Sequence, residues 1–294
     1  ARLLPREPGS GTHRDADASG AVLLVGGLTL LLLAVVDDGL RGLGLAAAVF
    51  LAGFVLRQRT AQTPLLPLQV LASRIVAAAN IVFALLVAAM FGFQFLVTLY
   101  FQRVLGYSPL QAGLGIFPVA AGIAATSLVI FPAVSRRIAP TWLIVPGLLA
   151  LAAGMGLLTG VPVHGDYLRH VAPSLALFAI GGGLALPATM TTAMSAVDPA
   201  HAGAASGLIN TSQQVGGAIG LAVLASLAAS HASSLSAHGH ATGPALVAGF
   251  HLAWTVGAAL LAIAAVIAAL LVARPSRAGY GAPDRPAEAP VSAA

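Results

Sequence analysis

Long apolar runs separated by short polar segments recur along the whole chain. Eight runs have the roughly 17–25 residues that an α-helix needs to cross the hydrocarbon core of a bilayer. They cover residues 20–36, 40–56, 75–101, 110–131, 142–161, 172–194, 203–229 and 251–273. The pattern predicts an all-α polytopic membrane protein with eight transmembrane helices.

The predicted helix at 75–101 has one polar and aromatic face. Asn80, Val87, Phe91, Gln94 and Thr98 fall at i, i+7, i+11, i+14 and i+18, which places them on a single side of a helix. Lipid cannot satisfy an amide, so such groups turn toward a neighbouring helix or an aqueous cavity. The stripe is therefore either a cavity wall that contacts substrate or a set of helix–helix hydrogen bonds.

The predicted helix at 203–229 combines small residues with amides. Its glycines recur four residues apart, at Gly203 and Gly207 and again at Gly216 and Gly220. This spacing lets two helices approach closely inside a bilayer. Between the pairs lie Asn210, Gln213 and Gln214, which we expect to face the substrate cavity. Alternatively, these amides only bond neighbouring helices, at about 0.6 kcal/mol each.

Glycine and proline mark two further helices. Gly113 and Pro118 predict close packing and a kink in the helix at 110–131. Gly181 and Gly183, followed by Pro187, predict that the helix at 172–194 bends or opens locally. The helices at 142–161 and 251–273 are apolar almost all round, which favours positions against lipid. Those at 20–36 and 40–56 are expected to form a structural hairpin.

A short internal repeat suggests how the later helices are related. Residues 108–113, at the entrance to the fourth helix, resemble residues 198–203, at the entrance to the seventh. Each copy has a capping residue, a proline in the first turn and then Ala-Gly. One copy lies outside and the other inside in the predicted topology, as a 3+3 inverted repeat of helices requires.

Composition and charge agree with a membrane protein. The chain is 58% hydrophobic and 8% charged, against about 25% charged residues in soluble domains. All basic residues are arginines at the ends of apolar runs, which excludes a nucleic-acid partner and sets orientation. With the N-terminus inside, only Arg41, Arg103 and Arg169 lie outside. Both termini are therefore expected on the cytoplasmic side of the plasma membrane.

These assignments divide the chain into five parts. Residues 1–19 form a cytoplasmic lead-in, 20–56 two helices, and 57–74 a cytoplasmic linker with an interfacial segment at 64–74. Residues 75–273 form a six-helix domain, and 274–294 a disordered tail rich in proline, alanine and charge.

Few side chains in the sequence could catalyse a reaction or bind a metal ion. All nine acidic residues lie in loops, tails or span ends, and there is no cysteine. An intramembrane enzyme would need acids or histidines clustered at one depth. His231, His238 and His240 fall together in a predicted outer loop at 230–250, without a carboxylate beside them. We therefore expect no metal and no cofactor, and an enzyme is the less favoured alternative.

Several stretches resemble one transporter family. Residues 100–114 with Pro118 look like a helix junction of the fourteen-helix drug/proton antiporters of the major facilitator superfamily. Residues 181–187 and 202–222 resemble later helices of that family, and 63–68 resembles the linker after its second extra central helix. The resemblance covers nearly the whole chain.

The resemblance implies a function and a missing partner. Residues 20–56 would be the two extra central helices and 75–273 the C-terminal six-helix domain, so six N-terminal helices would be absent. The protein would be part of a secondary active transporter that exports small amphipathic or apolar compounds by proton antiport and alternating access. Its partners would be the lipid bilayer, a small-molecule substrate, protons and the N-terminal half.

One motif departs from the family pattern. The loop at 135–141 has Arg136 where the family often has an acid, followed by Arg137, which puts its role as an inner-gate latch in doubt. Because no carboxylate is embedded in a predicted span, a coupling acid would lie in the absent half. The alternative to a transporter is a truncated, non-transporting membrane remnant or scaffold.

Overall fold

The computed structural model describes residues 18–36, 42–60, 74–197 and 202–272. Every regular element within these ranges is a helix. In chain order they are α1 (Ala18–Val36), α2 (Leu43–Thr60), α4 (Arg74–Arg103), α5 (Pro109–Ala125), the π-helical turn η2 (Thr126–Ile130), α6 (Phe131–Ser135), α7 (Pro140–Leu158), the π-helical turn η3 (Tyr167–Val171), α8 (Ala172–Ser195), α9 (Ala202–Ala237) and α10 (Thr242–Val272).

The predicted all-α membrane fold is confirmed. Six helical segments are long and apolar enough to cross a membrane, and they correspond to the six spans predicted from residue 75 onward. The two other predicted spans are also helical, as α1 and α2. In α2, Leu43–Phe54 is a shorter apolar helical stretch.

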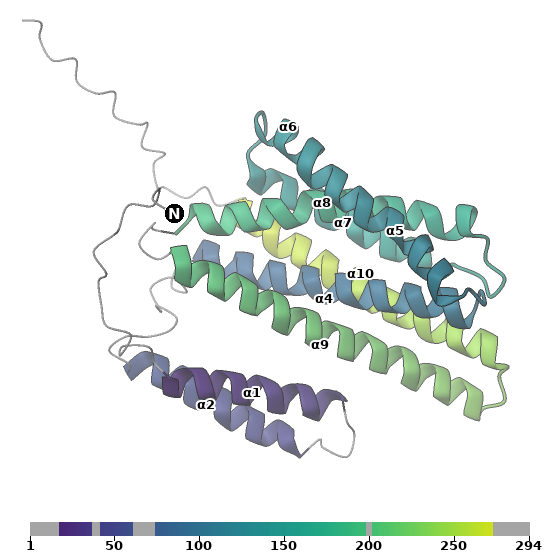
Figure 1. Ribbon diagram of the computed structural model, residues 1–294, viewed down its shortest axis with the longest axis horizontal. Helices are drawn as coiled ribbons and strands as arrows, with labels where there is room; N and C mark the ends of the chain where they lie inside the picture. Colours follow the sequence, from purple (N-terminus) through teal and green to yellow (C-terminus); the bar gives the residue numbers. More distant parts are fainter. Residues whose placement is uncertain (1–17, 37–41, 61–73, 198–201, 273–294) are drawn as a thin grey trace, which may run out of the picture.

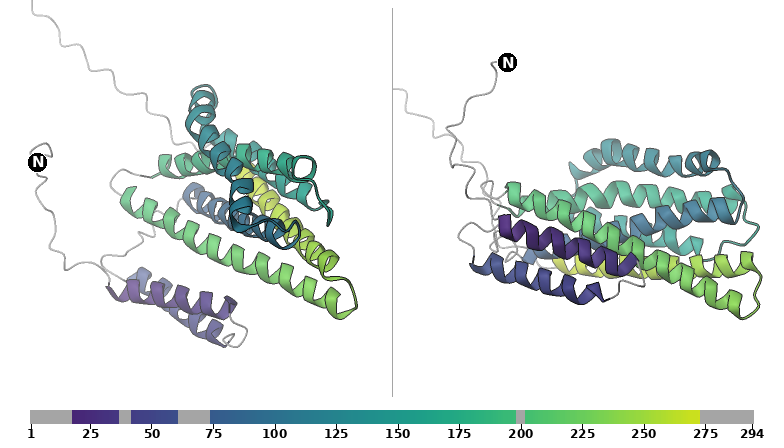
Figure 2. Two further views of the ribbon diagram at one scale, coloured as in Figure 1. Left: turned by 45° about the vertical axis from the view of Figure 1, so that its right-hand side comes forward. Right: turned by 60° about the horizontal axis from the view of Figure 1, so that its bottom comes forward.

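Helix α4 lies at the centre of the six-helix bundle and packs against α5, α8, α9 and α10 (Figure 1). Its buried side chains include Phe93, whose ring stacks on that of Phe178 from α8 with 3.6 Å between centroids. The α1–α2 hairpin lies beside α9, which it contacts through α1 (Figure 2). The hairpin therefore borders the bundle on the α9 side.

Helices α4 and α9 approach each other through small residues. A Cβ atom added at Gly216 would lie 2.6 Å from the carbonyl oxygen of Ala84, and one added at Gly220 would overlap Ala88. Both contacts join residues 132 positions apart, so the two helices run parallel in a constant register. This is the close packing that small residues four apart permit inside a bilayer.

The local opening predicted in α8 is not present. The helix runs unbroken from Ala172 to Ser195, with Pro187 in its interior. A Cβ at Gly181 would lie 2.6 Å from the carbonyl oxygen of Gly147 on α7, and one at Gly183 would overlap Thr126 of η2. The glycines are needed because neighbouring backbones press against them. The irregular backbone lies instead in the α5 span, where η2 precedes Pro132 in the first turn of α6.

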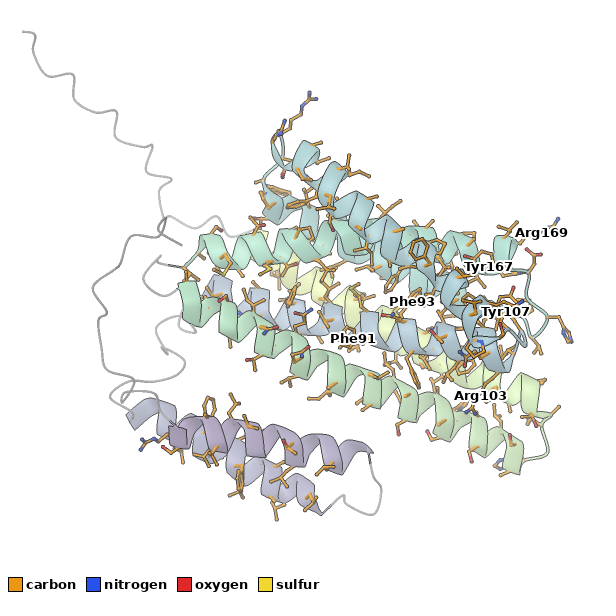
Figure 3. The ribbon with its side chains drawn as sticks, in the orientation of Figure 1. Phe91, Phe93, Arg103, Tyr107, Tyr167 and Arg169 are labelled. Carbon is orange, nitrogen blue, oxygen red and sulfur yellow. The ribbon has the colours of Figure 1, made fainter. Side chains whose placement is uncertain are left out.

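Aromatic and polar contacts hold one end of the bundle together. The Tyr167 hydroxyl donates to the carbonyl oxygen of Gly115 at 2.8 Å, and the Tyr167 ring lies 5.9 Å from that of Phe101. Ser108 and Gln111 form a capping box at the start of α5. Arg103, Tyr107, Tyr167 and Arg169 all lie at this end (Figure 3).

The prediction of a loop over residues 230–250 is wrong. Helix α9 continues to Ala237 and α10 begins at Thr242, so His231 lies within a helix and only a tight turn remains, with Gly239 at φ 87°. Residues 230–237 contain no glycine or proline, the two residues least favourable in a helix interior, and the helix ends just before Gly239. At 36 residues α9 is about 54 Å long, well beyond the hydrocarbon thickness of about 30 Å.

Some sequence predictions lie outside the described residues. They are the lead-in before residue 18, the interfacial segment up to residue 73, the tail from 274, and the capping half of the second repeat copy at 198–201.

The packing of α4 on α9 predicts different effects for two Gly→Ala substitutions in one helix. Gly216→Ala should lower the free energy of unfolding by about 1–3 kcal/mol, since the added methyl forces the Ala84 backbone away. Gly207→Ala is the matched control, because a Cβ at Gly207 would meet nothing within 4 Å. Thermal unfolding in detergent measures both, and equal melting temperatures for the two variants would contradict this packing.

Candidate functional site

A cavity of about 340 Å³ lies between four helices of the bundle. Helices α4, α5, α8 and α9 supply its walls. The lining residues are Val87, Met90, Phe91, Phe93, Gln94, Gly113, Ile116, Phe117, Val119, Ala120, Ile123, Phe178, Leu186 and Gln213. The volume is at the small end of the roughly 300–1,000 Å³ of ligand pockets, and the predominantly apolar lining is typical of them.

Aromatic rings dominate the cavity. Phe91 and Phe93 come from α4 (Figure 3). Phe93 is fixed by its stacked partner Phe178 and is almost fully buried. Phe91 and Phe117 are 40% and 64% exposed, so they flank the open side of the cavity. The Phe91 ring lies against Gly217 of α9, where an added Cβ would be 2.6 Å from the ring.

Two carboxamides complete the lining. Gln94 comes from α4 and Gln213 from α9. Within the described part of the chain, neither side-chain amide has a hydrogen-bond partner. Such groups inside a bilayer protein face water or a ligand. These two amides are therefore the polar groups that a molecule in the cavity can reach.

The helix register places the two amides at opposite ends of the cavity. With the offset of 132 residues between the two helices, Gln213 of α9 lies level with residue 81 of α4, thirteen residues before Gln94. Because the helices are parallel and rise 1.5 Å per residue, the two Cα atoms are about 20 Å apart along the bundle axis. The cavity thus has an aromatic middle and a hydrogen-bonding group on either side.

Asn80 lies in the α4–α9 contact and not in the cavity lining. It is 6% exposed, its side-chain N–H donates to the carbonyl oxygen of Val76 at 2.9 Å, and its side-chain oxygen accepts from the Ser212 hydroxyl at 2.9 Å. The Asn80–Ser212 bond has the same offset of 132 residues as the glycine contacts. Asn80 therefore makes a helix–helix hydrogen bond, which was the alternative to a cavity wall for the polar face of the helix predicted at 75–101.

The remaining cavity candidates also lie outside the lining. The Thr98 hydroxyl donates to the carbonyl oxygen of Gln94 at 2.7 Å, within the same helix. Asn210 and Gln214 are exposed on α9, on either side of Gln213. The cavity candidates that the structure brings together are Phe91, Gln94 and Gln213.

The packing and gate candidates are distributed over the bundle. Gly113 lines the cavity, and Pro118 is exposed on α5. A Cβ at Gly203 or Gly207 would meet nothing within 4 Å. Arg136 and Arg137 are exposed at the turn between α6 and α7. The structure leaves their predicted gate role untested.

Sequence reasoning missed most of the aromatic lining. Phe93, Phe117, Phe178 and Met90 are apolar residues in apolar helices, and their spacing alone does not separate them from lipid-facing positions. The glycine next to Gly216 was an available signal, because Gly217 makes room for the Phe91 ring.

The sequence model of one protein family, the Major Facilitator Superfamily, matches residues 18–221. The chain belongs to the Major Facilitator Superfamily. The match includes α4, α5 and α8 and the part of α9 that carries Gln213, so it covers all four walls of the cavity.

Within this superfamily the chain is similar to drug and antibiotic resistance proteins. It is 35% identical over 285 residues to the puromycin resistance protein pur8 of Streptomyces alboniger, covering 92% of this chain and 56% of that protein. It is 38% identical over 244 residues to the cephamycin export protein CmcT of Amycolatopsis lactamdurans, covering 79% of this chain and 50% of that protein. It is 33% identical over 228 residues to the tetracenomycin C resistance and export protein of Streptomyces glaucescens, covering 74% of this chain and 41% of that protein. The chain spans about half the length of the curated relatives it matches.

The described part of this superfamily member offers few acidic groups. It contains no group of three or more His, Cys, Asp or Glu side chains arranged to hold a metal ion. Asp166 is the single acidic residue in the described ranges, and its carboxylate accepts from the backbone N–H of Arg169 at 3.0 Å. It caps η3, at the end of the bundle marked by Arg169 in Figure 3.

The Asn80–Ser212 contact predicts a stabilising role that can be separated from ligand binding. Asn80→Ala and Ser212→Ala should each lower stability, with a coupling energy of about 0.6 kcal/mol and at most about 1.7. A double-mutant cycle on thermal unfolding measures this coupling. Ligand affinity should be unchanged in both variants. A loss of affinity at unchanged stability would instead assign Asn80 to the cavity.

Proposed function

We propose that this chain is the C-terminal part of a secondary transporter that exports small amphipathic or apolar compounds. The observation that carries the proposal is the cavity, in which two unpartnered amides stand in an aromatic wall. Apolar lining with a few convergent polar groups is the usual character of a site for small molecules. The export and resistance functions named for the similar proteins support the direction of transport.

The proposal includes a second half that faces this cavity. The related proteins are about twice as long as the chain. Helix α5 leaves Leu114 and Phe117 exposed beside the cavity, so a further wall is needed to enclose a substrate. We infer that six N-terminal helices supply that wall, with 18–60 as two central extra helices and α4 to α10 as the C-terminal domain.

Alternating access and proton antiport belong to the same proposal. The register-locked α4–α9 pair gives this half a rigid wall that can move as one body against the other half. Proton exchange near neutral pH needs a carboxylate or a histidine of suitable pKa. The lining contributes neither, so we place the proton-carrying residue in the N-terminal half.

The proposed location is the plasma membrane, with both ends of the chain in the cytoplasm. Arg57, Arg74, Arg136 and Arg137 lie toward the end proposed as cytoplasmic, whereas Arg103 and Arg169 lie at the other. The excess of arginine on one side follows the positive-inside rule.

The cavity assignment predicts transport defects for two amides. In cells expressing the complete transporter, Gln94→Ala and Gln213→Ala should each raise the KM for export about 3–10-fold. That range corresponds to the loss of one hydrogen bond of about 0.5–1.5 kcal/mol. Puromycin is the first compound to measure, because a similar protein confers resistance to it.

Phe95→Ala is the matched control for the cavity assignment. Phe95 is 41% exposed on α4, as Phe91 is, but does not line the cavity. Unchanged kinetics in both glutamine variants would refute the assignment. Export by this chain alone in proteoliposomes would refute the need for a second half. If the complete protein exports no compound at all, the remnant or scaffold alternative is favoured.

A further inference from the structure

We propose that this wall of the cavity selects neutral, flat aromatic compounds that carry a hydrogen-bonding group, and rejects permanent cations with the same rings. The inference rests on the proposed function, since it names the substrate class of the same cavity. It is carried by three features of the lining: its lack of charge, its aromatic rings, and its two amides.

The lining contains no ionisable side chain. Asp166, the one acidic residue that the structure describes, caps η3 at the far end of the bundle. A cation that binds against this wall therefore gains no opposite charge from it in return for the hydration that it loses there. A buried charge without a partner is strongly disfavoured, whereas a neutral molecule avoids this cost.

The aromatic rings do not replace the missing charge. A cation is attracted to the face of a ring. Phe93 and Phe178 are stacked on each other with an interplanar angle of 7°, so each has one face covered by the other ring. Phe91 lies against Gly217, which occupies part of its surface as well. The positive edges of these rings attract the face of a flat aromatic ligand but repel a cation.

The dimensions match a fused ring system. An apolar cavity of about 150 Å³ takes one benzene ring, and this cavity is roughly twice that size. Gln94 and Gln213 both line this cavity. Each carboxamide can both donate and accept, so a hydroxyl or carbonyl on two or three fused rings finds a partner at either of them.

A matched pair of probes tests the inference on the chain itself, reconstituted in nanodiscs of zwitterionic lipid. The probes are 2-(hydroxymethyl)anthracene and (anthracen-2-ylmethyl)trimethylammonium, which share the ring system and differ in charge. Saturable binding is followed by anthracene fluorescence, after subtraction of binding to empty nanodiscs. The neutral alcohol should bind at least about tenfold more tightly than the cation.

Variants then locate the selectivity. Gln94→Glu should reduce the preference for the alcohol about tenfold or more, because it supplies the missing negative charge. Gln213→Glu tests the same point at the other end of the cavity if the first variant fails to fold. Phe95→Ala, which alters an exposed ring outside the lining, should leave both affinities unchanged.

The outcomes separate this inference from the proposed function. Equal saturable binding of both probes, or tighter binding of the cation, would overturn the selectivity while leaving the cavity as a ligand site. Selectivity that persists unchanged in both glutamate variants would also overturn it. If neither probe binds saturably, the cavity is no binding site and both proposals fail.

Discussion

A polar group inside a bilayer has no solvent partner, and this constraint organises the parallel pair of α4 and α9. Where the two helices touch, the side chains of Asn80 and Ser212 satisfy each other and small residues close the gap. Further along the same pair, Gln94 and Gln213 find no partner among the described residues, and there a cavity opens. The hydrogen-bonded pair lies in the helix contact, and the two glutamines without a partner line the cavity.

The constant register of α4 and α9 links the helix contact at Asn80 to the cavity at Gln94 and Gln213. Contacts at an offset of 132 residues run from Asn80–Ser212 through Ala84–Gly216 and Ala88–Gly220. A fixed register sets the depth of Phe91 and of both glutamines together. The spacing of about 20 Å between the Cα atoms of the two glutamines is therefore a property of the helix pair and not of one side chain. Stacking of Phe93 on Phe178 ties the same pair to α8.

Hydropathy and helical spacing were sufficient to predict the class of fold, since a span of lipid-soluble residues has few alternatives to a helix. They also placed Asn80 and Gln94 on one face. They could not show that Asn80 bonds a neighbouring helix while Gln94 lines the cavity, because this depends on contacts with α9, which lies about 130 residues away in sequence. The aromatic lining from α5 and α8 was missed for the same reason. The end of α9 was missed because residues 230–237, which contain no glycine or proline, continue the helix past the predicted span, as at His231.

The proposed cavity requires that the side chains of Gln94 and Gln213 face water. The chain has no cysteine, so Gln94→Cys, Gln213→Cys and Phe95→Cys each introduce one unique thiol. Labelling in membranes with a water-soluble thiol reagent depends on the thiolate, which forms in water and not in lipid. We expect both glutamine positions to react at least about tenfold faster than position 95. Inert thiols at 94 and 213 together with a reactive one at 95 would contradict the central claim.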